Sequence, residues 1–128
     1  MASVMVVDDE DVLLEMVAAL IEDLGYRAVI ATNGREALAA LEAEADPPLL
    51  IISDVMMPQM NGIALAQAVK THPRFQQVPI VLMSAANRPQ TQGIADHFIH
   101  KPFDLDHIER LIDQYNRYDS SGPETGLH

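Results

Sequence analysis

Apolar residues follow two alternating patterns along the chain. Short unbroken runs bounded by turn residues are typical of strands buried on both faces of a parallel sheet. Such runs cover residues 3–7, 27–31, 49–53 and 78–83, and a shorter run at 97–100 predicts a fifth strand. Between the runs, apolar residues recur at helical spacing. This spacing predicts helices over 13–24, from the turn at 32–34 to about Ala45, over 61–72 and over 105–115.

The alternation of strands and helices predicts one α/β domain. Its parallel sheet would carry helices on both faces, joined by right-handed crossovers. The segment 87–93 departs from the pattern because it is mostly polar and contains Pro89 and Gly93, so we predict a loop or at most one helical turn. Residues 119–128 are polar with Gly and Pro. We therefore expect a domain over 1–118 and a flexible tail over 119–128.

Composition excludes several classes of protein. The chain has 128 residues, of which 48% are hydrophobic, which excludes general disorder. It has no Cys, which excludes disulfides, Cys-bound zinc and thiol catalysis. A net charge of -11 argues against binding nucleic acid or an anionic membrane. Neither a signal peptide nor a membrane span is present, and we expect a cytoplasmic protein. The Met1 start and the short tail lead us to expect a stand-alone protein.

Polar residues follow the predicted strands at their carboxyl ends. Asp8 and Asp9 follow the first strand, Asp54 the third, Ser84 the fourth and Lys101 the fifth. Because parallel strands end at one edge of a sheet, these side chains should surround one crevice. Crowded carboxylates form an oxygen-only site for a hard cation, for which Mg²⁺ is the expected occupant. An ionised Asp54 beside the cation would be a nucleophile toward phosphorus, with Ser84 and Lys101 as donors to phosphoryl oxygens.

Each of these residues also has an ordinary structural interpretation. Asp54 suits a turn before the loop that contains Pro58, and the acids at 8–11 suit a helix N-terminus. Lys101 suits a solvated turn, and Ser84 suits a strand end. The five His show no metal-ligand spacing and are interpreted as surface or structural residues. Three Met in the loop after Asp54 are interpreted as packing residues: Met56, Met57 and Met60.

The motifs together resemble the receiver domain of bacterial two-component response regulators. The matching segments are 6–10 (VVDDE), 53–62 (SDVMMPQMNG), 82–85 (LMSA) and 98–103 (FIHKPF). No single motif is specific, but their order and spacing are, and the resemblance covers about residues 3–117. It implies the flavodoxin-like, doubly wound five-stranded parallel sheet with strand order 2-1-3-4-5.

The resemblance also implies roles for the residues at the strand ends. Asp54 is the implied phosphoacceptor and a metal ligand, Asp9 the direct Mg²⁺ ligand, and Asp8 the second acid, often acting through water. The backbone carbonyl of Met56 is implied as a further ligand. Ser84 and Lys101 are implied to bind the phosphoryl group, Phe98 occupies a switch position, and the peptide before Pro102 is implied to be cis.

Two departures from the family pattern carry expectations. Only 16 residues separate Ser84 from Lys101, fewer than receivers usually have, so the fourth helix should be shortened or absent. The side chains thought to tune hydrolysis in the family correspond to Met56 and Ala86. Both are apolar and unable to orient a water, which predicts slow self-dephosphorylation.

The resemblance implies a phosphoacceptor signalling domain that catalyses its own phosphorylation, not a separate enzyme. The implied partners are a sensor histidine kinase or histidine phosphotransfer protein and an unidentified downstream protein. One alternative is a receiver-like adaptor that works without phosphorylation. Another is a phosphatase with an aspartyl nucleophile, which usually needs a second acid at the position held by Met56.

Overall fold

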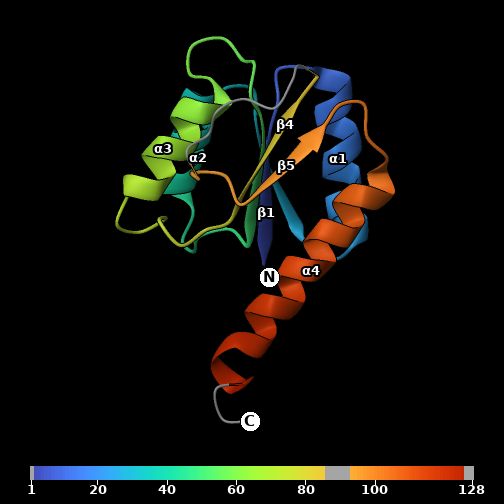
Figure 1. Cartoon of the computed structure of the whole chain (residues 1–128), viewed down its shortest axis with the longest axis vertical. Coiled ribbons are helices and arrows are strands. Elements are labelled where there is room, and N and C mark those ends of the chain that lie inside the picture. Colours follow the sequence, from blue (N-terminus) through green and yellow to red (C-terminus); the bar gives the residue numbers. More distant parts are fainter. Residues whose placement is uncertain (1, 86–92, 126–128) are drawn as a thin grey trace.

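The computed structural model describes residues 2–85 and 93–125, and the side chains of the last helix as far as residue 116. Strands and helices alternate along the described chain, except that its last two strands follow each other with no described helix between them (Figure 1). Their bounds are β1 Ser3–Val7, α1 Asp11–Asp23, β2 Arg27–Ala31, α2 Gly34–Ala43, β3 Leu50–Asp54, α3 Gly62–Thr71, β4 Ile80–Ser84, β5 His97–His100 and α4 Leu105–Thr125.

The strands form one parallel sheet in the order β2-β1-β3-β4-β5. This order and the four helices found in the described part of the chain confirm the flavodoxin-like class. Because β1 and β3 are neighbours in the middle of the sheet, the residues that follow them lie side by side. Asp54 is the last residue of β3 and pairs with Met83 of β4, so Ser84 stands beside it at the same edge.

Two apolar layers hold the helices on the sheet. In Figure 1, α2 and α3 cover one face, and α1 and α4 lie on the other. One cluster contains Ile51, Leu65 and Phe75, and the other contains Ile52, Val17 and Ile108, all almost fully buried. Burying one such side chain contributes about 1.5–3 kcal/mol, so packing against the sheet, more than helix propensity, fixes the helices.

Asn side chains begin two of the helices. The Oδ1 of Asn33 accepts a hydrogen bond from the N–H of Glu36 at 2.9 Å, and the Oδ1 of Asn61 accepts one from the N–H of Ala64 at 2.8 Å. Each satisfies a backbone donor that has no partner within its helix. Asn61 therefore fixes the point at which the loop after Asp54 turns into α3.

Several element boundaries differ from the sequence predictions, and three of the differences have a clear physical cause. β3 includes Asp54 because the parallel ladder continues one residue further than the apolar run. β4 begins only at Ile80, after Pro79, whose missing N–H suits the start of a strand. α4 continues through 119–125, which we predicted as part of a tail, because adding a turn to an existing helix needs no new nucleus.

Two further predictions concern segments at the limits of the described chain. Ala85 and residues 93–96 contain no helix between β4 and β5, while most of the predicted loop at 87–93 lies outside the described residues. The division of the chain at residue 118 stays a prediction. Among the described helices, none combines the length and the apolar character that crossing a bilayer requires.

Candidate functional site

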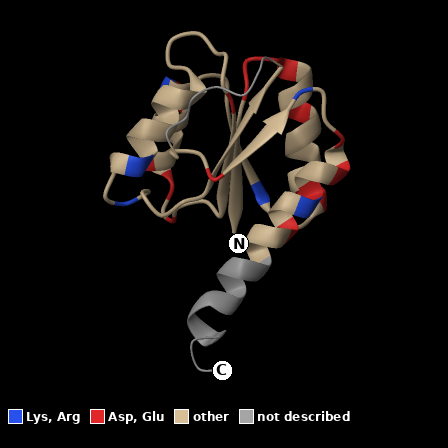
Figure 2. Ribbon diagram, in the orientation of Figure 1, with Lys and Arg blue, Asp and Glu red and all other residues tan. Residues whose placement is uncertain are grey.

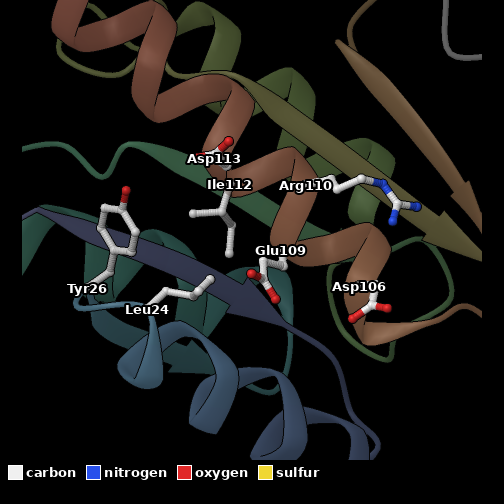
Figure 3. A pocket seen from close by; sticks show the side chains of 7 residues that line it. All are labelled: Leu24, Tyr26, Asp106, Glu109, Arg110, Ile112 and Asp113. Carbon is white, nitrogen blue, oxygen red and sulfur yellow. The ribbon is translucent and has the colours of Figure 1, made fainter.

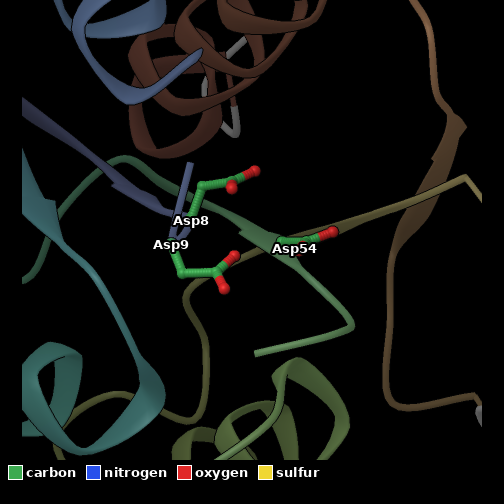
Figure 4. A group of neighbouring side chains, drawn as sticks. All are labelled: Asp8, Asp9 and Asp54. Carbon is green, nitrogen blue, oxygen red and sulfur yellow. The ribbon is translucent and has the colours of Figure 1, made fainter. Parts of the chain in front are cut away.

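Three carboxylates meet at the carboxyl edge of the sheet (Figure 4). Asp8 and Asp9 follow β1, and Asp54 ends β3. One oxygen atom from each of the three lies within 4.8 Å of the others. Asp8 and Asp54 are buried, whereas Asp9 is exposed. The structure thus brings together the three acids that the sequence predicted would converge.

Asp8 is the most constrained of these acids. Its side chain is fully buried, and its two oxygens have separate partners. Oδ1 accepts the backbone N–H of Glu10 at 2.8 Å, and Oδ2 accepts from the Nζ of Lys101 at 2.9 Å. A buried carboxylate is costly unless it is paired and hydrogen-bonded, and both conditions are met here.

Lys101 brings positive charge into the acidic site from the end of β5. Its Nζ lies 2.9 Å from Asp8, 2.9 Å from Oε1 of Glu10 and 3.3 Å from Oδ1 of Asp54. Burial would lower the pKa of Lys101, but its hydrogen bonds to Asp8 and Glu10 outweigh burial and raise that pKa above its ordinary value. Lys101 is therefore a fixed ammonium group.

Asp54 is a carboxylate whose ionised form is disfavoured by its surroundings. Burial, followed by the negative charge of Asp8, raises the pKa of Asp54 from 3.8 to about 6, against the opposing effect of Lys101. The group is still mainly ionised at neutral pH, because neutral pH lies above this value. An ionised but poorly solvated carboxylate at a strand end is well suited to nucleophilic attack.

The donor set fits a magnesium ion. Mg²⁺ is bound through carboxylate oxygens and water, and the three acids offer such oxygens in one place. The single ammonium of Lys101 faces three carboxylates, so negative charge is in excess. After burial, the charge of Asp8 is the next cause that raises the pKa of Asp54. A divalent cation would offset that excess. The Met56 carbonyl as a further ligand stays a prediction.

The remaining predicted residues lie around this edge. Ser84 is buried at the end of β4, and its carbonyl accepts the backbone N–H of Lys101 at 2.8 Å. The peptide between Lys101 and Pro102 is cis, as the resemblance implies. Phe98 is partly buried and packs against the core on the α2 and α3 face. The structure thus brings Ser84 and Lys101 to the acids, and the roles of Ser84 and Phe98 stay predictions.

The loop after Asp54 corrects one sequence interpretation. Met57 and Met60 pack against the core, as expected, but the side chain of Met56 is 69% exposed. Interpreting Met56 as a packing residue was wrong. The loop turns through Gln59 at φ 65° and returns to α3, which leaves Met56 on the outside. The Met56 side chain therefore faces solvent in the loop directly after the acidic site.

Gly62 sets the position of Asp54 through the backbone. Its N–H donates to the carbonyl of Val55 at 3.0 Å, which ties the start of α3 to the end of β3. A Cβ atom at position 62 would lie 2.2 Å from the carbonyl oxygen of Asp54. Only a residue without a side chain allows this close approach. Gly62 is thus a positioning glycine, which its place at the start of a helix did not reveal.

Replacing Gly62 with Ala is expected to destabilise the protein by about 2–4 kcal/mol, because rigid backbone atoms must move to admit the methyl group. Urea unfolding measures the loss. Gly25→Ala is the matched control: nothing lies within 4 Å of an added Cβ there, and only the φ of 94° is unfavourable. Its cost should be about 1 kcal/mol. Equal losses in the two variants would show that the contact with Asp54 has no special weight.

A separate hollow of about 300 Å³ lies between the end of α1 and α4 (Figure 3). Burial, and then the charge of Asp113, raises the pKa of Tyr26 in its wall. The hollow shares no residue with the acidic edge. Its lining residues are Leu24, Tyr26, Asp106, Glu109, Arg110, Ile112 and Asp113. The whole sequence has 19 Asp and Glu against 8 Lys and Arg, and Figure 2 shows acidic residues on both α1 and α4.

Sequence reasoning missed one member of the site, Glu10. Its carboxylate binds Lys101, and its backbone N–H binds Asp8. The available signal was its position directly after the acid pair, on the same loop and at the same sheet edge. The consecutive acids at 8–11 indicate a shared cation or favourable charge at a helix N-terminus, and neither interpretation predicts a contact with Lys101.

Comparisons with known proteins agree with this geometry. A family model described as the response regulator receiver domain matches residues 4–113. Response regulator Rre1 of Synechocystis sp. is 37% identical over 116 residues, which make up 86% of this chain and 49% of Rre1. The chain therefore spans about half the length of that curated relative.

Two solved structures have the same fold as this chain. The chemotaxis response regulator CheY4 of Vibrio cholerae is 30% identical, with a TM-score of 0.79 over 90% of this chain and 98% of that one. The response regulator TrrA of Thermotoga maritima, in complex with Mg²⁺-BeF, is 25% identical, with a TM-score of 0.79 over 90% of this chain and 99% of that one.

Proposed function

The chain belongs to the response regulator receiver family, and from this membership we propose that Asp54 accepts a phosphoryl group from a phosphohistidine donor, with Mg²⁺ at the acidic edge. The observation that carries the proposal is the environment of Asp54. It is a buried carboxylate at the end of β3, with two further acids and an ammonium group around it. The complex of TrrA with Mg²⁺-BeF supports the choice of metal.

The proposed reaction is an in-line displacement at phosphorus. A carboxylate oxygen of Asp54 forms the new bond to phosphorus while the bond from phosphorus to the imidazole nitrogen of the donor breaks. The imidazole keeps the electron pair and takes up a proton. A bound Mg²⁺ would neutralise charge on the phosphoryl oxygens during this transfer.

Residues of the chain supply the remaining electrostatic stabilisation. The ammonium of Lys101 already lies 3.3 Å from Asp54, so it is within reach of a phosphoryl oxygen attached there. The hydroxyl of Ser84 is a second proposed donor, at the end of the neighbouring strand. Removing one such donor from a preorganised site commonly costs about 10²–10³ in rate.

Two alternative functions are less well supported. An adaptor that works without phosphorylation has no need to hold Asp8 fully buried or to surround Lys101 with three acids. A phosphatase of the aspartyl-nucleophile type needs a general acid close to the nucleophile, and the exposed side chain two residues after Asp54 is Met56. The proposed partners are a histidine kinase or phosphotransfer protein and an unidentified target protein. A cytoplasmic location stays a prediction.

One experiment distinguishes the three functions. The protein and its Asp54→Ala variant are incubated with Mg²⁺ and radiolabelled acetyl phosphate. Stoichiometric label that requires Asp54 supports the receiver. No label on either protein supports the adaptor, and rapid turnover of phosphate esters supports the phosphatase.

The phosphorylated protein is expected to lose its phosphoryl group slowly. The Met56 thioether beside the site has no group to orient an attacking water, whereas an amide would provide one. Met56→Asn should therefore shorten the lifetime of the phosphoprotein severalfold, measured as loss of radiolabel. Met56→Leu, which stays apolar, is the control and should match the wild type. A wild-type lifetime of seconds would contradict the expectation. Ala86, the second predicted position, lies outside the described residues.

A further inference from the structure

Each N–H donor of the Lys101 ammonium group already has a carboxylate partner. An ammonium carries three N–H groups, and the Nζ of Lys101 has three carboxylate partners, in Asp8, Glu10 and Asp54. The Lys101 side chain is only 13% exposed. A phosphoryl group that arrives on Asp54 can gain a hydrogen bond from Lys101 only if one of these contacts is given up.

The three partners differ in how readily they can be released. Asp8 is fully buried, and removing its cation would leave a buried charge uncompensated. Asp54 is the group that reacts. The Glu10 side chain is 65% exposed, so water can replace Lys101 as its partner at small cost. Glu10 is therefore the contact that gives way.

We propose that Glu10 is a positioning residue that holds the ammonium of Lys101 in the unphosphorylated protein and is displaced from it by the phosphoryl group. This inference rests on the proposed function of Asp54. Glu10 then acts against phosphorylation in two ways. Its carboxylate occupies an N–H of Lys101 that the incoming phosphoryl oxygens need. It also places a negative charge close to the site that an anionic phosphodonor must approach.

Displacement of Glu10 would also change the surface beside the site. Glu10 and Lys101 form part of the wall of a hollow of about 330 Å³, whose other lining residues are Leu13, Ala85, Pro102 and Phe103. Released from Lys101, the Glu10 carboxylate is free to leave this wall. The phosphorylation state of Asp54 would thereby alter a mostly apolar surface next to α1.

The test compares Glu10→Gln with Asp11→Asn. Asp11 is the exposed neighbouring acid at the start of α1, and its replacement removes the same charge without removing an observed contact to Lys101. Labelling by acetyl phosphate with Mg²⁺ forms the bond between Asp54 and phosphorus and releases acetate. Glu10→Gln should accelerate labelling about threefold to tenfold, the effect of one nearby charge in a partly solvated site. Asp11→Asn should change the rate by less than about twofold, because its charge is screened by solvent.

A spectroscopic measurement separates positioning from a general charge effect. In the wild-type protein, Mg²⁺ with beryllofluoride, used as a phosphoryl mimic, should shift the carboxyl carbon resonance of Glu10 and leave that of Asp11 nearly unchanged. An unchanged Glu10 resonance, equal acceleration in both variants, or slower labelling of Glu10→Gln would each overturn the inference. Absence of label on the wild type would instead overturn the proposed function, and the inference with it.

Discussion

Replacing Asp54 with Asn is expected to abolish phosphoryl labelling and, in the absence of Mg²⁺, to make the protein more stable at neutral pH. Labelling is lost because the amide is not a nucleophile toward phosphorus. Stability rises because Asp54 is ionised against its environment: burial and the charge of Asp8 raise its pKa to about 6. A neutral side chain of the same shape removes that conflict while leaving Lys101 its contacts with Asp8 and Glu10.

The pH dependence gives the sign of the stability change. The pKa of Asp54 is higher in the folded protein than its ordinary value of 3.8. The folded state therefore binds the proton more tightly, and this contribution to stability is complete below the ordinary value and is lost as pH rises through about 6. At neutral pH the wild type should be less stable than Asp54→Asn by roughly 1–3 kcal/mol, and the difference should shrink toward pH 4.

Urea unfolding across this pH range, without and with Mg²⁺, measures the effect. Adding Mg²⁺ should stabilise the wild type more than the variant, because the variant lacks one ligand. Asp46→Asn, at an exposed carboxylate outside the acidic edge, is the control and should be nearly neutral under all conditions. A variant that is less stable than the wild type at neutral pH would contradict the raised pKa of Asp54. Label retained on Asp54→Asn would contradict its role as phosphoacceptor.

The sequence was sufficient to predict the fold because buried parallel strands leave unbroken apolar runs. The runs at 3–7, 27–31 and 97–100 match β1, β2 and β5 residue for residue. The other two runs, 49–53 and 78–83, differ from β3 and β4 by one or two residues at each end. Displacements occur where backbone pairing, not hydrophobicity, decides the limit. At β3 the ladder includes Asp54, and beyond it the N–H of Val55 still donates to the carbonyl of Met83 at 2.8 Å.

Apart from Glu10, the members of the site were predictable from topology. Parallel strands end at one edge, so Asp8, Asp54 and Lys101 had to approach one another once the strand order was known. Their unequal environments were not predictable. That Asp8 is fully buried while Asp9 is exposed depends on side-chain direction at consecutive positions, which has no signature in composition or spacing.

Two contacts could not be predicted from the sequence, for a different reason. The approach of Gly62 to the carbonyl of Asp54 is a backbone distance set by the loop between β3 and α3. The contact between Glu10 and Lys101 joins residues far apart in the sequence through a flexible, exposed side chain. Exposed polar contacts of this kind leave no periodicity in a sequence, although they decide which group Lys101 can release.

Replacing Lys101 with Met is expected to be the most destabilising single change at the site. It leaves Asp8 buried with no cation, beside Asp54 and Glu10. Breaking a buried ion pair by removing one partner costs about 3–5 kcal/mol, because the remaining charge is uncompensated. Labelling of Asp54 should fall at least about 10²-fold, since one preorganised donor to the phosphoryl oxygens is gone.

The matched control is Lys70→Met. Lys70 also has an acidic partner, with its Nζ 3.0 Å from Asp96, but both side chains are partly solvated. A solvated pair contributes about 0–1 kcal/mol, so Lys70→Met should lose little stability and no labelling. Equal losses in the two variants would mean that the burial of Asp8 does not set the cost.

Protons and Mg²⁺ should each restore part of the stability of Lys101→Met. The ammonium of Lys101 lowers the pKa of Asp54, so removing it raises this pKa further in the folded protein. The variant then takes up its proton at a higher pH than the wild type, so the stability difference should narrow as pH falls from above neutral toward about 6. At neutral pH, Mg²⁺ should stabilise the variant by more than it stabilises the wild type, because the cation now compensates acids that Lys101 no longer neutralises. A deficit that responds neither to pH nor to Mg²⁺ would point to lost packing of the lysine stem instead of lost charge.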